Sequence, residues 1–83
     1  MDQVVAAWGA AIRNRRDELR MTQRDLATAA GTTQQYLSQL ERGAVEPGLD
    51  LKRRIATALQ TSLAELFPYP EDLEAPAPAV AAS

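Results

Sequence analysis

The sequence predicts an all-α fold, a compact domain of five helices followed by a tail without regular structure. Apolar residues recur at spacings of three and four along most of the chain, which is the pattern of helices with one buried face. Thr or Ser precedes several of these stretches and Gly or Pro follows them, as at helix starts and ends. A chain of 83 residues suits one small domain. We expect that domain to span residues 4–67, and a Pro- and Ala-rich, acidic, disordered tail to span residues 68–83.

The first two helices are predicted from an apolar stripe and a capping sequence. Trp8 and Ile12 lie four residues apart in the first helix, which is expected over residues 4–20. Thr22 can cap the next helix, because its hydroxyl can accept a hydrogen bond from a backbone N–H two or three residues later. Asp25, three residues after Thr22, completes an approximate capping box. The second helix is therefore expected to begin directly after Thr22.

A tight turn separates the second helix from the third. Gly31 can adopt the positive φ that ends a helix, and the small side chain of Ala27 lets the two helices approach closely. Thr33 is the expected cap of the third helix, residues 34–41, and Gly43 is its expected stop. Two short helices joined in this way form a helix-turn-helix, whose second helix is shaped to lie in a groove of DNA.

Two further helices are expected after this unit. Pro47 and Gly48 interrupt helical structure, so the fourth helix should begin near residue 49 or 50. A short fifth helix follows, capped by Thr61 or Ser62 and ended by Pro68. The side chains expected to face inward are Leu51, Ile55, Ala58 and Leu59 in the fourth helix and Leu63, Leu66 and Phe67 in the fifth.

The composition excludes several classes of protein. The chain contains no Cys and no His, which removes disulfides, the usual zinc sites and the commonest general base. We therefore expect no catalytic residue, no cofactor and no metal. No apolar run approaches the ~20 residues that cross a bilayer, and the N-terminus lacks the basic region of a signal peptide. These features predict a cytoplasmic protein that does not bind membranes.

The net charge is unusual for a protein that binds nucleic acid. The chain carries 9 basic and 11 acidic residues and has a pI of about 5.0. Three of the acids lie in the predicted tail, so residues 1–67 hold 9 basic against 8 acidic groups, a net charge of +1. Phosphate binding depends on local clusters of positive charge more than on the total. The composition is therefore compatible with a modest affinity for DNA.

Apolar anchors, caps, glycines and one charged pair occur in register across the five predicted helices. The residues are Gly9, Ile12, Arg13, Arg16, Thr22, Gln23, Leu26, Ala27, Gly31, Leu37, Leu40, Glu41, Arg42, Gly43, Pro47, Ile55, Ala56 and Leu59. This set, within residues 5–67, resembles the Cro/C1-type (XRE-like) helix-turn-helix family, which includes the lambdoid phage repressors. The resemblance implies a lambda-repressor-like DNA-binding domain of bacterial, phage or plasmid origin.

The resemblance also implies roles for polar residues on and around the third helix. Gln can bond adenine through two atoms, and Thr can touch a thymine methyl. The implied base contacts are Thr33, Gln34, Gln35, Ser38 and Gln39, and the implied phosphate contacts are Gln23, Tyr36, Arg42 and Arg53. An isolated Gln is more often a solvated surface residue. Base contact is expected here because three Gln residues share one exposed face. Tyr36 is equally suited to covering the junction between the second and third helices.

Other residues of the pattern are expected to be structural. Arg16 and Glu41 resemble a family ion pair that ties the first helix to the end of the third. Trp8 is expected in the core, with a dimer contact as the alternative. The ordinary expectation for Arg13, Arg15 and Arg20 is a solvated surface charge.

Lys52 departs from the family pattern. The family usually has an apolar residue five positions after the loop proline, and here that position is Lys52, with Leu51 immediately before it. The fourth helix is therefore expected to be rotated or to start differently. This leaves open which of Lys52, Arg53 and Arg54 points toward DNA.

The sequence predicts a sequence-specific regulator of transcription, a repressor that reads the major groove of double-stranded DNA with residues 34–41. One domain reads few base pairs, so we expect a homodimer on a palindromic operator. The dimer contact is expected at Leu63, Leu66 and Phe67, with Tyr69 beside them.

Two other classes of function stay open at this point. A protein-interaction adaptor with the same fold and no specific DNA binding would suit the low net charge and the acidic tail. An enzyme is a distant third, because the carboxylates form no convergent pair and no phosphate loop is present. Among regulators, a phage or plasmid repressor, a restriction-modification controller and an antitoxin with a toxin as partner fit the size equally.

Overall fold

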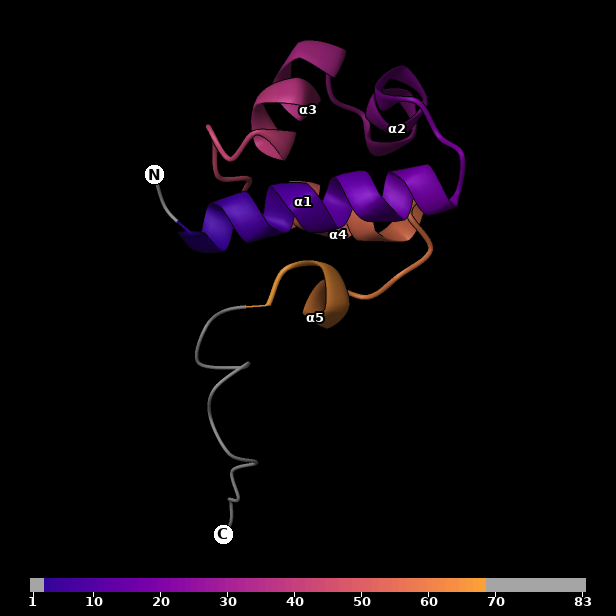
Figure 1. Ribbon diagram of the computed structural model, residues 1–83. Coiled ribbons are helices and arrows are strands. Elements are labelled where there is room, and N and C mark those ends of the chain that lie inside the picture. The colour runs from indigo at the N-terminus through magenta and orange to yellow at the C-terminus, as the bar shows by residue number, and fades with distance from the viewer. Residues whose placement is uncertain (1–2, 69–83) are drawn as a thin grey trace, which may run out of the picture.

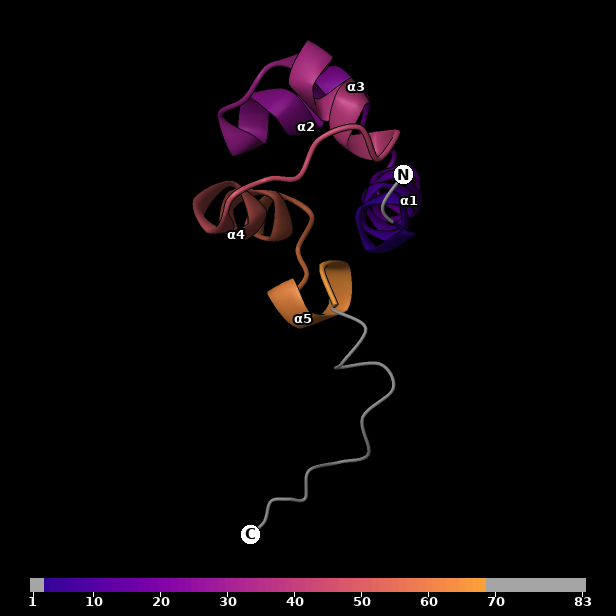
Figure 2. The same cartoon turned by 90° about the vertical axis from the view of Figure 1, so that its left-hand side faces the viewer.

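The computed structural model describes residues 3–68, which form five helices and no strand. The helices are α1 (Gln3–Glu18), α2 (Gln23–Ala30), α3 (Gln34–Glu41), α4 (Leu49–Ala58) and α5 (Leu63–Leu66). In Figures 1 and 2, α1 and α4 form a central layer, α2 and α3 lie together on one side of it, and α5 lies on the other. The predicted all-α, five-helix fold is confirmed. Of the predicted tail, everything after Pro68 lies outside the described residues.

The helix caps and the glycine turn of the helix-turn-helix form as the sequence predicts. The Thr22 hydroxyl accepts from the Asp25 backbone N–H at 2.9 Å, and the Asp25 carboxylate accepts from the Thr22 N–H at 3.0 Å, which completes the capping box. Thr33 caps α3 by accepting from the Tyr36 N–H at 3.0 Å. Gly31 has a φ of +71° and ends α2 in the left-handed conformation. These contacts set the angle at which α3 leaves α2.

Helix α1 approaches α3 so closely that a glycine is required at the contact. A Cβ atom built on Gly9 would lie 2.5 Å from the carbonyl oxygen of Glu41 and 2.6 Å from that of Leu40. The buried apolar side chains of the domain form one continuous core, each with less than a tenth of its surface exposed. They are Val5, Trp8, Ile12, Leu26, Ala27, Ala30, Leu37, Leu40, Ile55, Ala56, Leu59, Leu66 and Phe67. The core thus holds the apolar side of α3 in place, and the opposite face of this helix stays accessible.

The buried face of α4 differs from the predicted stripe. Ile55 and Leu59 are fully buried as expected, but Leu51 is only partly buried and Lys52 is 7% exposed. The Lys52 ammonium lies 4.0 Å from the centre of the Trp8 ring. Helix α4 therefore begins where it was expected, at Leu49, and the aromatic ring lets a lysine occupy an apolar position.

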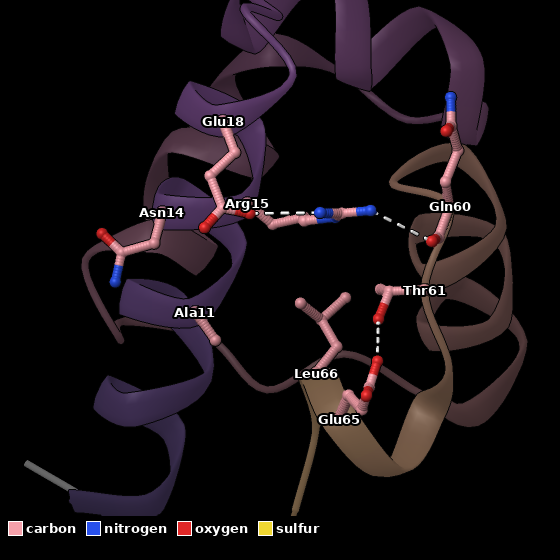
Figure 3. Close-up of a pocket in the computed structure, with 8 residues that line it drawn as sticks. All are labelled: Ala11, Asn14, Arg15, Glu18, Gln60, Thr61, Glu65 and Leu66. Atoms are coloured by element: carbon pink, nitrogen blue, oxygen red, sulfur yellow. Dashed lines mark hydrogen bonds and ion pairs between the residues drawn. The ribbon is translucent and has the colours of Figure 1, made fainter.

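Arg15 joins α1 to the end of α4 on the side of the domain that carries α5 (Figure 3). Its guanidinium donates to the carbonyl oxygens of Leu59 at 2.9 Å and Gln60 at 3.2 Å, and it pairs with Glu18 at 3.1 Å. A cation is favourable at the C-terminus of a helix, where carbonyl oxygens lack partners. The expectation that Arg15 is a solvated charge is therefore wrong, because the turn after α4 brings carbonyl groups within its reach.

Within residues 3–68, no helix combines the length and the apolar character that crossing a membrane requires.

Candidate nucleic-acid interface

The outer face of α3 is polar and uncharged. The one acidic residue of this helix, Glu41, is its last residue, and its side chain is largely buried. Ser38 and Gln39 lie four residues after Gln34 and Gln35, about one helical turn, so the four residues share a face. Leu37, on the opposite side of the helix, is 0% exposed. Helix α3 is thus anchored by its apolar side and presents amide and hydroxyl groups outward.

Six polar residues line one shallow hollow of about 390 Å³ between the start of α2 and the face of α3. The hollow offers both donors and acceptors, because each Gln amide supplies both, Ser supplies a hydroxyl and Arg supplies a planar cation. The residues are Gln23, Gln34, Gln35, Ser38, Gln39 and Arg42. All six belong to the predicted base and phosphate contacts.

Three predicted contact residues lie outside this hollow. The Thr33 hydroxyl accepts the capping hydrogen bond of α3, which commits one of its lone pairs. Tyr36 belongs to α3 and is half-buried. Arg53 is exposed and lines a separate depression with Ala29 and Thr57, where α2 meets α4. Their contacts with DNA stay predictions.

Arg42 closes the C-terminal end of the hollow. Its Nη1 donates to the Ser38 hydroxyl at 2.7 Å, one helical turn earlier. The side chain is exposed and keeps further N–H groups that can meet an anion. Because Arg is a planar cation, it suits a phosphate flanking the bases that α3 would read.

Arg16 and Glu41 form the expected ion pair between α1 and the end of α3. The Glu41 carboxylate accepts from Arg16 Nε at 2.8 Å and from Nη2 at 3.1 Å, so the pair is bidentate. The two side chains are 12% and 5% exposed. The hydrogen bond with Glu41 raises the pKa of Arg16 above its usual value, against the opposite effect of burial. Arg16 also donates to the Met21 carbonyl at 2.8 Å, which holds the chain just before α2.

Glu41 has a further partner that the sequence does not indicate. Gln23, the first residue of α2, donates from Nε2 to Glu41 Oε1 at 3.1 Å. Eighteen residues separate the two, and no periodic pattern in the sequence relates them. Only the packing of α2 against α3 brings this amide to the carboxylate.

The predicted dimer residues have different surroundings. Leu66 and Phe67 are 3% and 5% exposed and pack within the core, so little of either side chain is left for a second subunit. Leu63 is partly exposed, and it lines an apolar hollow with Leu49, which is 55% exposed. A dimer contact at Leu63, Leu66 and Phe67 stays a prediction, with Leu63 as its accessible member. Tyr69 lies outside the described residues.

The helix-turn-helix family matches residues 12–66 of this chain. An HTH-type transcriptional regulator of Mycobacterium tuberculosis is 39% identical over 59 residues, which are 71% of this chain and 42% of that protein. The chain thus spans less than half the length of that relative.

Two solved structures have the same fold. The restriction-modification controller protein C.AhdI from Aeromonas hydrophila superposes with a TM-score of 0.77 at 29% identity, covering 80% of this chain and 100% of that one. The P22 c2 repressor, crystallised with a synthetic operator, superposes with a TM-score of 0.71 at 33% identity, covering 74% and 92%. The chain therefore belongs to the helix-turn-helix family of transcriptional regulators, in its Cro/C1-type, lambda-repressor-like form.

Proposed function

We propose that this chain binds double-stranded DNA sequence-specifically and acts as a dimeric repressor, reading the major groove with α3. The observation that carries the proposal is the hollow in which three Gln side chains of α3 meet Gln23 and Arg42. A Gln amide matches the N7 acceptor and N6 donor of adenine, so Gln34, Gln35 and Gln39 are the proposed base-reading residues. The P22 c2 repressor, which shares this fold and was crystallised with a synthetic operator, supports DNA as the partner.

The proposed phosphate contacts flank the base contacts. Gln23 begins α2, where unpaired backbone N–H groups and the helix dipole favour an anion. Arg42 follows α3 at the other end of the hollow. Such contacts fix the register of a protein on DNA, and base contacts then select the sequence.

The proposed dimer surface centres on Leu63 and extends to the exposed Leu49. Two copies would place two α3 helices on half-sites about 34 Å apart, one helical turn of DNA. Replacing Leu63 with Glu should lower self-association, because a charge would lie in an apolar contact. Sedimentation of this variant tests the surface, and an unchanged mass distribution would rule it out. Leu66 and Phe67 are unsuitable for this test, because their replacement would open the core.

The experiment that tests the function is selection of bound duplexes from a random DNA pool. The expected product is a palindromic consensus that contains A·T pairs. Binding of that consensus should weaken steeply as salt rises, since neutralised phosphates release counterions. If no sequence is enriched and no salt dependence is found, the chain is instead an adaptor that uses this fold to bind protein.

A further inference from the structure

One carboxylate joins three helices next to the proposed DNA surface. Glu41 Oε2 accepts from Arg16 Nε at 2.8 Å, and Glu41 Oε1 accepts from both Arg16 Nη2 and Gln23 Nε2 at 3.1 Å. Arg16 belongs to α1, Gln23 begins α2 and Glu41 ends α3. The bidentate bond from Arg16 leaves the carboxylate little freedom to rotate, so it is a fixed acceptor for the Gln23 amide.

This arrangement restrains a side chain that would otherwise be mobile. A partly exposed Gln samples several rotamers, and fixing it on DNA costs side-chain entropy. Here one N–H of the Gln23 amide is already bonded to Glu41, and the amide lines the hollow of α3. The second N–H of the same amide remains to donate to a phosphate oxygen.

We propose that Glu41 is a positioning residue for the phosphate contact of Gln23. It would hold the amide at the edge of the reading surface before DNA arrives, so that the entropy is lost on folding and not on binding. The proposal rests on the proposed function, since it requires Gln23 to meet DNA. It assigns Glu41 a role beyond the ion pair that ties α1 to α3.

Two variants of Glu41 separate positioning from structure. Glu41→Gln and Glu41→Leu both remove the charge that pairs with Arg16, and both keep a side chain of similar size. Only Glu41→Gln keeps an oxygen that can accept from Gln23. Affinity for the selected duplex should be measured where circular dichroism shows both variants folded. We expect Glu41→Leu to bind about five- to tenfold more weakly than Glu41→Gln, because without an acceptor at position 41 the Gln23 side chain must be ordered when DNA binds.

The same pair of variants in a Gln23→Met background provides the control. Met keeps the length of the side chain and lacks the amide, so neither Glu41 variant has anything to position. The two double variants should then bind equally, which is a non-additive result for residues in contact. A difference between them as large as in the parent background would overturn the proposal, because Glu41 would then act through the packing of α3. Equal binding of the two single variants would overturn it as well.

The free wild-type protein provides a second measurement if either Glu41 variant unfolds. The side-chain amide protons of Gln23 should exchange with water more slowly than those of the exposed Gln60, which lies on the turn after α4. Equal exchange would show that the restraint does not exist. A wild-type protein that binds no DNA removes the proposed function itself, whereas a specific binder with equal Glu41 variants removes only the positioning role.

Discussion

The Lys52 ammonium lies 4.0 Å above the centre of the Trp8 ring, so a lysine fills a core position of α4 without breaking the core. The Phe67 ring, 5.6 Å from the same nitrogen, packs edge-on against Trp8 at an interplanar angle of 79°. Trp8 Nε1 in turn donates to the Pro68 carbonyl at 2.8 Å, which holds the end of α5 against α1. The lysine therefore belongs to the contacts that join α1, α4 and α5.

Replacing Lys52 measures how much its contact with Trp8 contributes to the free energy of unfolding. Lys52→Ala should lower the free energy of unfolding by about 2 kcal/mol, because it removes both the cation over the ring and the packed methylene stem. Lys52→Met keeps most of the packing and should lose about half as much. Urea denaturation of the three proteins checks this order, and a Lys52→Met variant less stable than Lys52→Ala would contradict it.

Gly9 is predicted to tolerate no side chain. Gly9→Ala should lower the free energy of unfolding by about 2 kcal/mol even though Ala is the better helix former, since its Cβ would meet the Glu41 and Leu40 carbonyl oxygens. Gly48 is a matched control, because a Cβ there has no atom within 4 Å and the residue is the N-cap of α4 without a side-chain bond. Gly48→Ser should raise stability by about 0.5 kcal/mol. Thermal unfolding of both variants tests the contrast.

Arg16→Met should be among the most destabilising substitutions of a charged residue in this chain, because the Arg16–Glu41 pair is largely buried. It would leave the Glu41 side chain, 5% exposed, with the Gln23 amide as its remaining hydrogen-bond partner, at a cost of about 3 kcal/mol. Arg54→Met removes an exposed i,i+4 pair with Asp50, 49% and 87% exposed, and should cost less than about 0.5 kcal/mol. Chemical denaturation distinguishes these values, and similar costs for the two variants would show that burial does not set the strength of the pair.

The capping box of α2 predicts a dependence of stability on pH. Hydrogen bonds from the Thr22 backbone hold the pKa of Asp25 below its usual value. A carboxyl whose pKa is lowered by folding stabilises the fold above its unfolded pKa, and the effect disappears as pH falls through the folded pKa. Wild type should thus exceed Asp25→Asn in stability at neutral pH, and the difference should shrink below about pH 4. A difference independent of pH between 7 and 2.5 would refute this explanation.

Base and phosphate contacts should respond differently to substitution. Gln34→Ala should relax the preference at one base position in each half-site at a cost of about 1 to 3 kcal/mol for the preferred base. Gln23→Ala should weaken binding to preferred and altered sites by the same factor, because a phosphate is present in every sequence. Titration of the two variants against a set of single-base operator changes separates the two roles. Equal effects on selectivity would show the division to be wrong.

The order and type of the helices followed from local patterns that need no tertiary contact. Thr22 and Thr33 precede α2 and α3 and cap them within three residues, and Gly31 reverses the chain because its backbone tolerates a positive φ. The polar face of α3 was predictable for the same reason, since helical spacing alone places Gln35 and Gln39 together.

Tertiary structure decided what each charged or amide group does. In sequence, Arg15 was indistinguishable from a solvated arginine, and the turn after α4 brings two carbonyl groups to it. The sequence left open whether Lys52 points toward DNA, and the structure places its ammonium over the Trp8 ring. Gln23 and Glu41 lie eighteen residues apart and meet only because α2 and α3 cross there. Periodicity encodes which face of a helix is apolar, whereas the partner of a long polar side chain depends on which other helix arrives within about 3 Å of it.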